Sequence, residues 1–201
     1  MDIQRINTYS DSRFSQKVLL QHGCFLADGQ PCEVEIVSDS EAIVRGGNTA
    51  AFEEVIEEFR FYTPHITKIF DENGAPIREF PNAVLLELPL AQLQPSQFYV
   101  DQEKIAAISS FIHAPRDIII QAAKLDGQYV SLDGHTRLYY AVTQGWDTVR
   151  AVEAEADDYI PDFVREARVR GIFSPRDMLP VSHREYEEKW YGFCDAYFER
   201  T

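Results

Sequence analysis

The chain has 201 residues, of which 45% are hydrophobic, and a formal net charge of -14 from 33 acidic and 19 basic residues. This length and hydrophobic content are sufficient for a folded core and argue against an intrinsically disordered chain. The acidic balance disfavours a nucleic-acid-binding protein, because binding to phosphate backbones depends on clustered cations. No apolar run of about 18 residues and no charged-then-apolar N-terminal segment is present, so we expect a cytoplasmic protein that does not contact a membrane.

Residues 1–82 are predicted to form an N-terminal unit made of a β-meander and a helix. Two extended runs flank Asp28-Gly29, which is a strong hairpin signal, and a third run covers Glu41 to Arg45. Apolar residues then recur at helical spacing up to about Tyr62. Two further extended runs flank Asn73-Gly74 and predict a second hairpin.

Residues 83–155 are predicted to form a central core with the order β-α-β-β-α-β. The predicted elements are a strand from Ala83 to Leu88, a helix from Gln102 to Ile112, strands on either side of Asp126-Gly127, a helix that ends at Gly145 and a strand from Thr148 to Ala154. Together with the N-terminal unit, this order places the chain in the α+β class.

Residues 156–201 are predicted to form a C-terminal helical extension packed on the core. Ser174-Pro175 and the capping box that begins at Ser182 are typical helix starts. The last helix carries an aromatic stripe that includes Trp190. Such a stripe could bind a ligand or a partner, but packing against the rest of the chain is the favoured interpretation.

The turn Asp133-Gly134-His135-Thr136-Arg137 is where local structure and chemistry indicate the same kind of site. Gly134 permits a sharp exit from a strand, and the first turn of the following helix presents N–H groups that can bind an anion such as phosphate. Asp133 could hold Mg²⁺ or orient a nucleophile, and His135 could contact a phosphate or relay a proton. Thr136 would donate a hydrogen bond from its hydroxyl, and the guanidinium group of Arg137 would bind the phosphate in a bidentate manner. In the alternative interpretation Asp133 caps the helix, His135 lies on the surface and Arg137 pairs with a carboxylate.

Other nucleotide-binding and hydrolytic motifs are absent from the sequence. It contains no P-loop, no Gly-x-Gly-x-x-Gly fingerprint, no His-Glu-x-x-His and no Gly-x-Ser-x-Gly. The sequence therefore gives no support for a P-loop, Rossmann, zincin or serine-hydrolase protein.

The order of motifs from about Leu85 to Ala154 resembles the ParB/sulfiredoxin-like superfamily. The resemblance rests on Leu93-x-Pro95, a helix, an Asp-Gly hairpin, the turn Asp133–Arg137 and a following helix and strand. Members of that superfamily bind nucleotide phosphates at the helix start that corresponds to Gly134–Arg137. The resemblance therefore implies a nucleotide-phosphate site, and our hypothesis is that it binds ATP, ADP or CTP together with Mg²⁺.

The branches of this superfamily imply different activities. Sulfiredoxins carry their catalytic cysteine where this chain has His135, so sulfinate reduction lacks its nucleophile here. Chromosome-partitioning ParB proteins share only Gly134 and Arg137 at the turn and continue into a DNA-binding domain, so partitioning is disfavoured. Free-serine kinases carry Asp-Gly-His-His-Arg, from which this turn differs only at Thr136.

A less characterised bacterial branch of the superfamily is similar over more of the chain. It shares the segment Pro95 to Tyr99, the whole Asp-Gly-His-Thr-Arg turn and Glu185-Tyr186 followed by Trp190. The kinases rely on a glutamate shortly after Leu-x-Pro, and by spacing Gln97 occupies that position. A glutamine cannot accept a proton as a general base.

Two functions of different classes follow. The first is a nucleotide-dependent, small-molecule phosphotransferase in which Gly134, His135, Thr136 and Arg137 hold the phosphates and Asp133 acts as metal ligand or base. The second is a regulatory or interaction module that keeps a vestigial anion pocket without turnover. In the second case, the acidic N-terminal unit or the aromatic C-terminal helix would bind a protein partner.

Overall fold

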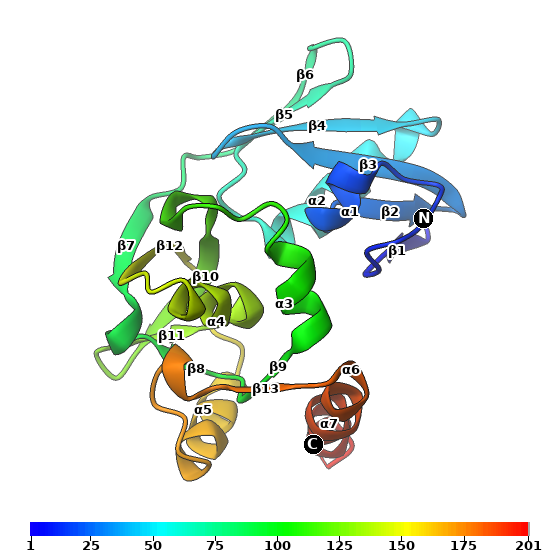
Figure 1. Cartoon of the computed structure of the whole chain (residues 1–201). Helices are drawn as coiled ribbons and strands as arrows, with labels where there is room; N and C mark the ends of the chain where they lie inside the picture. Colours follow the sequence, from blue (N-terminus) through cyan, green and yellow to red (C-terminus); the bar gives the residue numbers. More distant parts are fainter. Residues whose placement is uncertain (201) are drawn as a thin grey trace. The chain divides into compact units, whose positions relative to one another are not determined.

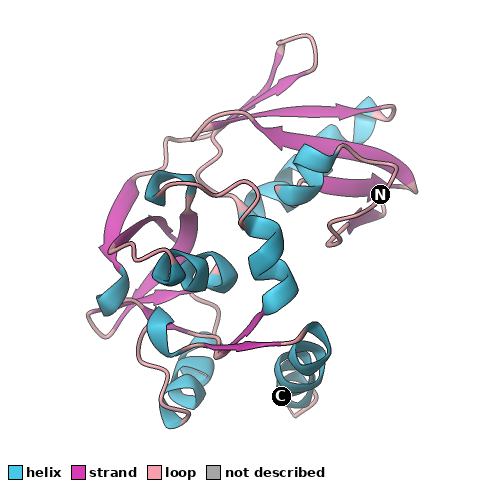
Figure 2. Cartoon of the chain, viewed as in Figure 1, coloured by secondary structure: helices cyan, strands magenta, loops and turns pink. Residues whose placement is uncertain are grey.

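The computed structural model of the chain describes residues 1–200 and contains two compact units. The first unit comprises Met1–Val84, and the second begins at Leu85. Both units contain helices and strands, so the predicted α+β class is confirmed (Figure 2). Within residues 1–200, none of the helices has the length and apolar character needed to span a membrane.

The first unit is a six-stranded sheet with the strands in sequence order. Its strands are β1 (Ile3–Arg5), β2 (Cys24–Ala27), β3 (Gln30–Ile36), β4 (Glu41–Gly46), β5 (Lys68–Asp71) and β6 (Pro76–Glu79). Its helices are α1 (Gln16–Leu20) and α2 (Phe52–Tyr62). Strands β4 and β5 are parallel because α2 lies between them in the chain, whereas the other neighbours are antiparallel.

The predicted hairpins and helix of the first unit are confirmed. Asp28 and Gly29 have φ values of 48° and 78°, which a two-residue hairpin turn with positive φ at both positions requires. On α2, Val55, Ile56 and Phe59 are buried in the core of this unit, while Glu53 is exposed. The helical period of apolar residues thus matches the face of α2 that is buried.

The second unit is built on a five-stranded sheet of order β7-β12-β10-β11-β8, with a separate pair β13-β9 (Figure 1). Its strands are β7 (Leu85–Pro89), β8 (Gln94–Pro95), β9 (Tyr99–Asp101), β10 (Ile119–Leu125), β11 (Gln128–Ser131), β12 (Thr148–Glu153) and β13 (Leu179–Val181). Its helices are α3 (Gln102–Ile108), α4 (His135–Thr143), α5 (Ile160–Val169), α6 (His183–Tyr186) and α7 (Gly192–Phe198). The predicted β-α-β-β-α-β order is present, with the short strands β8 and β9 added before α3.

Two helices of the second unit differ from the sequence prediction. Helix α3 ends at Ile108, four residues before the predicted end. The hydroxyl groups of Ser109 and Ser110 donate to the carbonyls of Ala106 and Ala107, each at 2.7 Å, and such bonds compete with helix continuation. The predicted helix start at Ser174 gives only one 3₁₀ turn, Pro175–Asp177, before β13.

The C-terminal segment is part of the second unit's core. Strand β13 runs parallel to β9, with Leu179 opposite Tyr99 (Figure 1). The capping box at Ser182 is confirmed, since its side chain accepts the N–H of Glu185. Between α6 and α7 a π-helical turn, Glu187–Tyr191, carries Trp190. The ring of Trp190 meets the fully buried Phe98 edge-on at 5.0 Å, so the aromatic stripe packs within this unit.

Candidate functional site

The candidate site is the turn between β11 and α4, and Gly134 shapes it. Gly134 lies at the N-cap of α4 with φ 81° and ψ 19°, a left-handed conformation that favours glycine. A Cβ atom at this position would lie 2.6 Å from Cγ2 of Ile120 on β10. The start of α4 is therefore pressed against the sheet, and a side chain at Gly134 would push it away.

Arg137 and Asp133 form an ion pair across this turn. Nη2 of Arg137 donates to Oδ2 of Asp133 at 2.9 Å, and Nη1 donates to the carbonyl oxygen of Ile119 at 2.8 Å. The two side chains are 31% and 50% exposed. The guanidinium group is thus fixed at the N-terminus of α4, and the Arg137 side chain as a whole is partly exposed. Asp133 does not occupy the N-cap position, which belongs to Gly134.

His135 lies in the interior, with only 6% of its surface exposed. Its Nε2 atom is 3.1 Å from the hydroxyl of Ser131 and 3.2 Å from the hydroxyl of Ser96, and it accepts the N–H of Ser96 at 3.3 Å. Burial lowers the pKa of His135 to about 4, against the opposing charge of Asp133. The ring is therefore neutral near pH 7. Its roles as phosphate contact or proton relay stay predictions.

Ser96 and Ser131 are contacts of His135 that the sequence analysis did not assign to the site. The Ser96 hydroxyl also donates to the carbonyl of Ser131 at 2.8 Å, so the segment after Leu93-x-Pro95 is bonded to the end of β11. The signal in the sequence was the Pro95-Ser96 pair, which is part of the segment shared with the bacterial branch. Its contact with His135 is long-range and becomes visible only in the fold.

The first turn of α4 provides donors that point along the helix axis. The first intrahelical bond runs from the N–H of Leu138 to the carbonyl of Gly134 at 2.9 Å. The N–H groups of residues 135–137 come before this bond and therefore have no acceptor within the helix. Thr136 is partly exposed on this turn. Thr136 and the Arg137 guanidinium group are therefore the exposed side-chain donors that can act together with the positive end of the helix dipole.

Asp133 is the carboxylate that could hold a metal ion at this turn. Among residues 1–200, no three His, Cys, Asp or Glu side chains are grouped as a metal site. A Mg²⁺ ion, however, is commonly bound by one or two carboxylates together with substrate phosphates and water. The half-exposed carboxylate of Asp133 fits a Mg²⁺ ion that arrives with a nucleotide and does not fit a protein-only metal site.

Gln97 has a structural position in the second unit. It is 8% exposed, and its Nε2 atom donates to the carbonyl of Tyr99 and, at 3.2 Å, to the hydroxyl of Tyr186 on α6. The amide thus connects the segment before β9 to the C-terminal helices. An amide side chain has no titratable group, so Gln97 cannot act as a general base.

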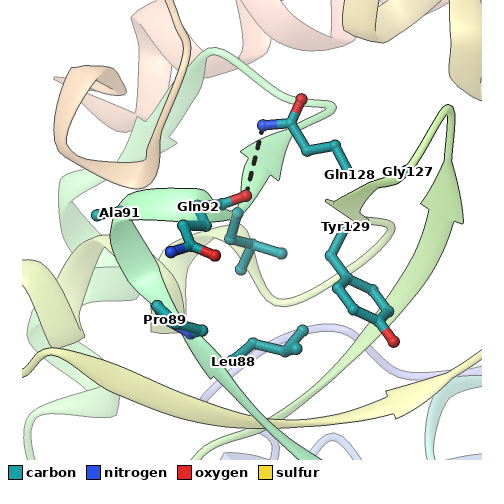
Figure 3. Close-up of a pocket in the computed structure, with 8 residues that line it drawn as sticks. Leu88, Pro89, Ala91, Gln92, Gly127, Gln128 and Tyr129 are labelled. Carbon is teal, nitrogen blue, oxygen red and sulfur yellow. Dashed lines mark hydrogen bonds between the residues drawn. The ribbon is translucent and has the colours of Figure 1, made fainter.

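A separate pocket of about 360 Å³ lies at the opposite end of β11 (Figure 3). Its lining residues are Leu88, Pro89, Ala91, Gln92, Leu93, Gly127, Gln128 and Tyr129. Nε2 of Gln128 donates across it to the carbonyl of Gln92 at 3.4 Å (Figure 3). Gln128 precedes Asp133 by five residues, which corresponds to roughly 16 Å of extended chain. The pocket is therefore distinct from the turn at α4.

Comparison with known proteins gives structural matches only. No protein-family model matches the chain, and no curated protein matches it. Protein Atu1540 from Agrobacterium tumefaciens is similar with 12% identity and a TM-score of 0.36, over 48% of this chain and 62% of that one. Sulfiredoxin from Arabidopsis thaliana is similar with 19% identity and a TM-score of 0.31, over 41% of this chain and 97% of that one. At these identities and TM-scores, neither match carries an argument about activity.

Proposed function

We propose that this chain binds a nucleotide through its phosphates at the turn Asp133–Arg137 and transfers a phosphoryl group to a small hydroxyl-bearing molecule. One observation carries the proposal. The Arg137 guanidinium group is held at the N-terminus of α4 by its hydrogen bond to the carbonyl of Ile119, and the Arg137 side chain is still 31% exposed. A pre-positioned guanidinium group beside helix N–H groups favours a phosphate, because charge-assisted bonds and the helix dipole act on the same ligand.

A nucleotide phosphate that binds Arg137 would have to replace the ion pair between Arg137 and Asp133. Nη2 of Arg137 already donates a hydrogen bond to Asp133. An incoming phosphate oxygen would therefore compete with the Asp133 carboxylate for this donor. In the proposed complex a phosphate oxygen would accept from Nη2 of Arg137, and Asp133 would hold a Mg²⁺ ion, which would neutralise charge on the phosphates. Gly134 keeps the backbone close to the sheet, and Thr136 adds its hydroxyl. His135 supports the turn from inside through Ser96 and Ser131.

A second candidate function is a non-catalytic module that binds the nucleotide as a regulatory ligand. The bonds of Gln97 favour it, because the position expected to carry a general base holds a buried amide that contacts Tyr99 and Tyr186. The two functions share the phosphate site and differ in turnover. A pool of small hydroxyl-bearing metabolites with Mg²⁺ and ATP or CTP separates them, since nucleotide consumption supports the enzyme and binding without consumption supports the module.

The melting temperature of the full chain tests the shared part of both functions. ATP, ADP and CTP at millimolar concentration with Mg²⁺ are compared with adenosine and cytidine, which lack phosphates. We expect at least one nucleotide to raise the melting temperature and the nucleosides to leave it unchanged, because a ligand that binds only the folded state stabilises it. The absence of a shift with every nucleotide would contradict the proposed site.

A further inference from the structure

The backbone that leads into β10 accepts hydrogen bonds from two arginine side chains. Nη1 of Arg137 donates to the carbonyl oxygen of Ile119, the first residue of β10, at 2.8 Å. Three residues earlier, the carbonyl oxygen of Arg116 accepts a hydrogen bond from Nη2 of Arg150. A chain of three residues spans at most about 11 Å even when fully extended. The two guanidinium groups are therefore held by acceptors on one short segment.

The strand pairing places Arg150 beside the residue that holds Arg137. Strands β10 and β12 are parallel, and Arg150 on β12 lies opposite Ile119 on β10. Neighbouring strands of a sheet lie about 4.8 Å apart. Because Arg137 bonds to the carbonyl of this same Ile119, the backbone of Arg150 is one strand spacing from the residue at which the Arg137 guanidinium group is fixed. Arg150 therefore lies next to the turn Asp133–Arg137.

Three positive features follow one another along the start of β10. The first turn of α4, with its N–H groups, lies against Ile120. The guanidinium group of Arg137 is bonded at the preceding residue, Ile119. The guanidinium group of Arg150 is bonded further along the same backbone, at Arg116. This order gives a row of a helix N-terminus and two guanidinium groups, and not a single cation at the helix start.

A row of this kind favours an anion that carries several charges in a chain. The bond from Arg150 to a carbonyl orients the guanidinium group, and the carbonyl has no net charge with which to neutralise it. Guanidinium groups bind phosphate oxygens through charge-assisted hydrogen bonds. A single phosphate at the start of α4 would use the helix N–H groups and Arg137. A chain of two or three phosphates would also extend toward Arg150.

We propose that Arg150 binds the phosphate adjoining the one bound by Arg137, so that the site takes nucleoside diphosphates and triphosphates in preference to monophosphates. The inference rests on the proposed phosphate site at the turn and adds a specificity-determining residue to it. One phosphate would contact the N–H groups of α4 and Arg137, and the next phosphate of the chain would contact Arg150. A monophosphate would take the position at α4 and leave Arg150 without a ligand.

A purely structural role for Arg150 makes a different prediction. In that case Arg150 only joins β12 to the turn before β10 and balances the charge of Glu87, which lies opposite it on β7. Its replacement would then change the binding of every nucleotide by the same factor, because the number of phosphates has no influence. A comparison of ligands on one variant separates the two roles, since a change in the fold of the variant affects all ligands alike.

The test measures the dissociation constants of AMP, ADP and ATP by isothermal titration of the full chain at one Mg²⁺ concentration and one ionic strength. The variants are Arg150→Gln and Arg150→Lys. The matched control is Arg184→Gln, which removes an exposed arginine of the same unit that is paired with Glu188. We expect wild type and Arg184→Gln to bind ADP and ATP at least about tenfold more tightly than AMP.

The ligand dependence of the variants carries the expected result. Arg150→Gln should weaken the binding of ADP and ATP by at least about tenfold and that of AMP by less than about twofold. Arg150→Lys keeps the charge but loses the planar guanidinium group, so its affinity for ADP and ATP should fall between those of wild type and Arg150→Gln.

The results that contradict the inference are distinct from failure of the proposed function. Equal affinity of wild type for AMP and ATP would overturn the inference, as would a change in Arg150→Gln that is the same for all three ligands. In both cases the nucleotides still bind, so the phosphate site at the turn stands. If wild type binds none of the three nucleotides, the inference and the proposed phosphate site both fail.

Discussion

Nε2 of His135 lies 3.2 Å from the hydroxyl of Ser96, although the two residues are 39 positions apart in the chain. The contact joins the segment that follows Leu93-x-Pro95 to the start of α4, and both side chains are buried. Because Nε2 also accepts the N–H of Ser96, protonation of this nitrogen would break a buried hydrogen bond. The turn proposed to bind phosphate thus depends on a histidine that stays neutral.

The neutral state of His135 predicts a loss of stability in acid. Burial lowers its pKa from 6.5 to about 4 in the folded chain, so the unfolded chain binds more protons between these values. The contribution of His135 to the free energy of unfolding is therefore complete above pH 6.5 and decreases by up to about 3 kcal/mol as the pH falls toward 4. Urea unfolding of wild type and His135→Gln across this range measures it. A variant with the same pH dependence as wild type would contradict the assignment.

The two glycines that flank α4 give a matched comparison of backbone strain and steric conflict. Both have positive φ, 81° at Gly134 and 71° at Gly145, but of the two only Gly134 has heavy atoms within 4 Å of the place that a Cβ atom would occupy. We expect Gly145→Ala to lower the free energy of unfolding by about 1 kcal/mol. Gly134→Ala should lower it by about 2–4 kcal/mol, because contact with Ile120 adds to the strain. Equal losses in urea unfolding would show that α4 is not pressed against β10.

The aromatic cluster around Phe98 predicts that the C-terminal helices unfold together with the sheet. Phe98 is 0% exposed and meets Trp190 and Phe193 edge-on, each at 5.0 Å. Phe98→Ala should therefore lower the free energy of unfolding by about 3–5 kcal/mol. Phe173→Ala, at a position that is 57% exposed, should change it by about 0.5 kcal/mol or less. Tryptophan fluorescence during urea unfolding reports both, and similar effects of the two variants would exclude the cluster as a core element.

Asp133→Asn tests whether Asp133 is the residue that connects nucleotide binding to Mg²⁺. The Asp133–Arg137 pair is partly exposed, so its loss should change the free energy of unfolding by about 1 kcal/mol or less. Nucleotide binding in EDTA should become tighter, because the competing carboxylate charge is removed from Arg137. The difference in affinity between Mg²⁺ and EDTA should shrink, because the variant lacks the carboxylate that would hold the ion. Titration of wild type and variant under both conditions measures this, and an unchanged dependence on Mg²⁺ would exclude Asp133 as the metal ligand.

The local features of the fold could be predicted from sequence because their causes are local. Asp28-Gly29 permits a tight hairpin, and the apolar period of α2 matches its buried face. The strand β13 was not predicted, because three residues, Leu179–Val181, carry too little pattern and gain their order from β9, about 80 positions earlier. The end of α3 was misplaced because the apolar period continues to Ile112, while the hydroxyls of Ser109 and Ser110 bond back to the helix.

The candidate site likewise has local features that the sequence predicts and long-range contacts that it does not. The glycine turn at Gly134 and a carboxylate partner for Arg137 were both accessible from the spacing of the turn. The interior position of His135 was not, because it depends on Ser96 arriving from a distant segment.

Isothermal titration of the full chain with ATP and CTP in the presence of Mg²⁺ tests the central claim most directly. The variants are Arg137→Ala, Arg137→Lys and the control Arg184→Ala, which removes an exposed arginine of the same unit that is paired with Glu188. We expect saturable binding by wild type and Arg184→Ala, and at least about tenfold weaker binding by Arg137→Ala, because one charge-assisted hydrogen bond contributes about 1.5–3 kcal/mol. Arg137→Lys should fall between them. Binding by Arg137→Ala that equals wild type, or no binding by wild type, would contradict the account.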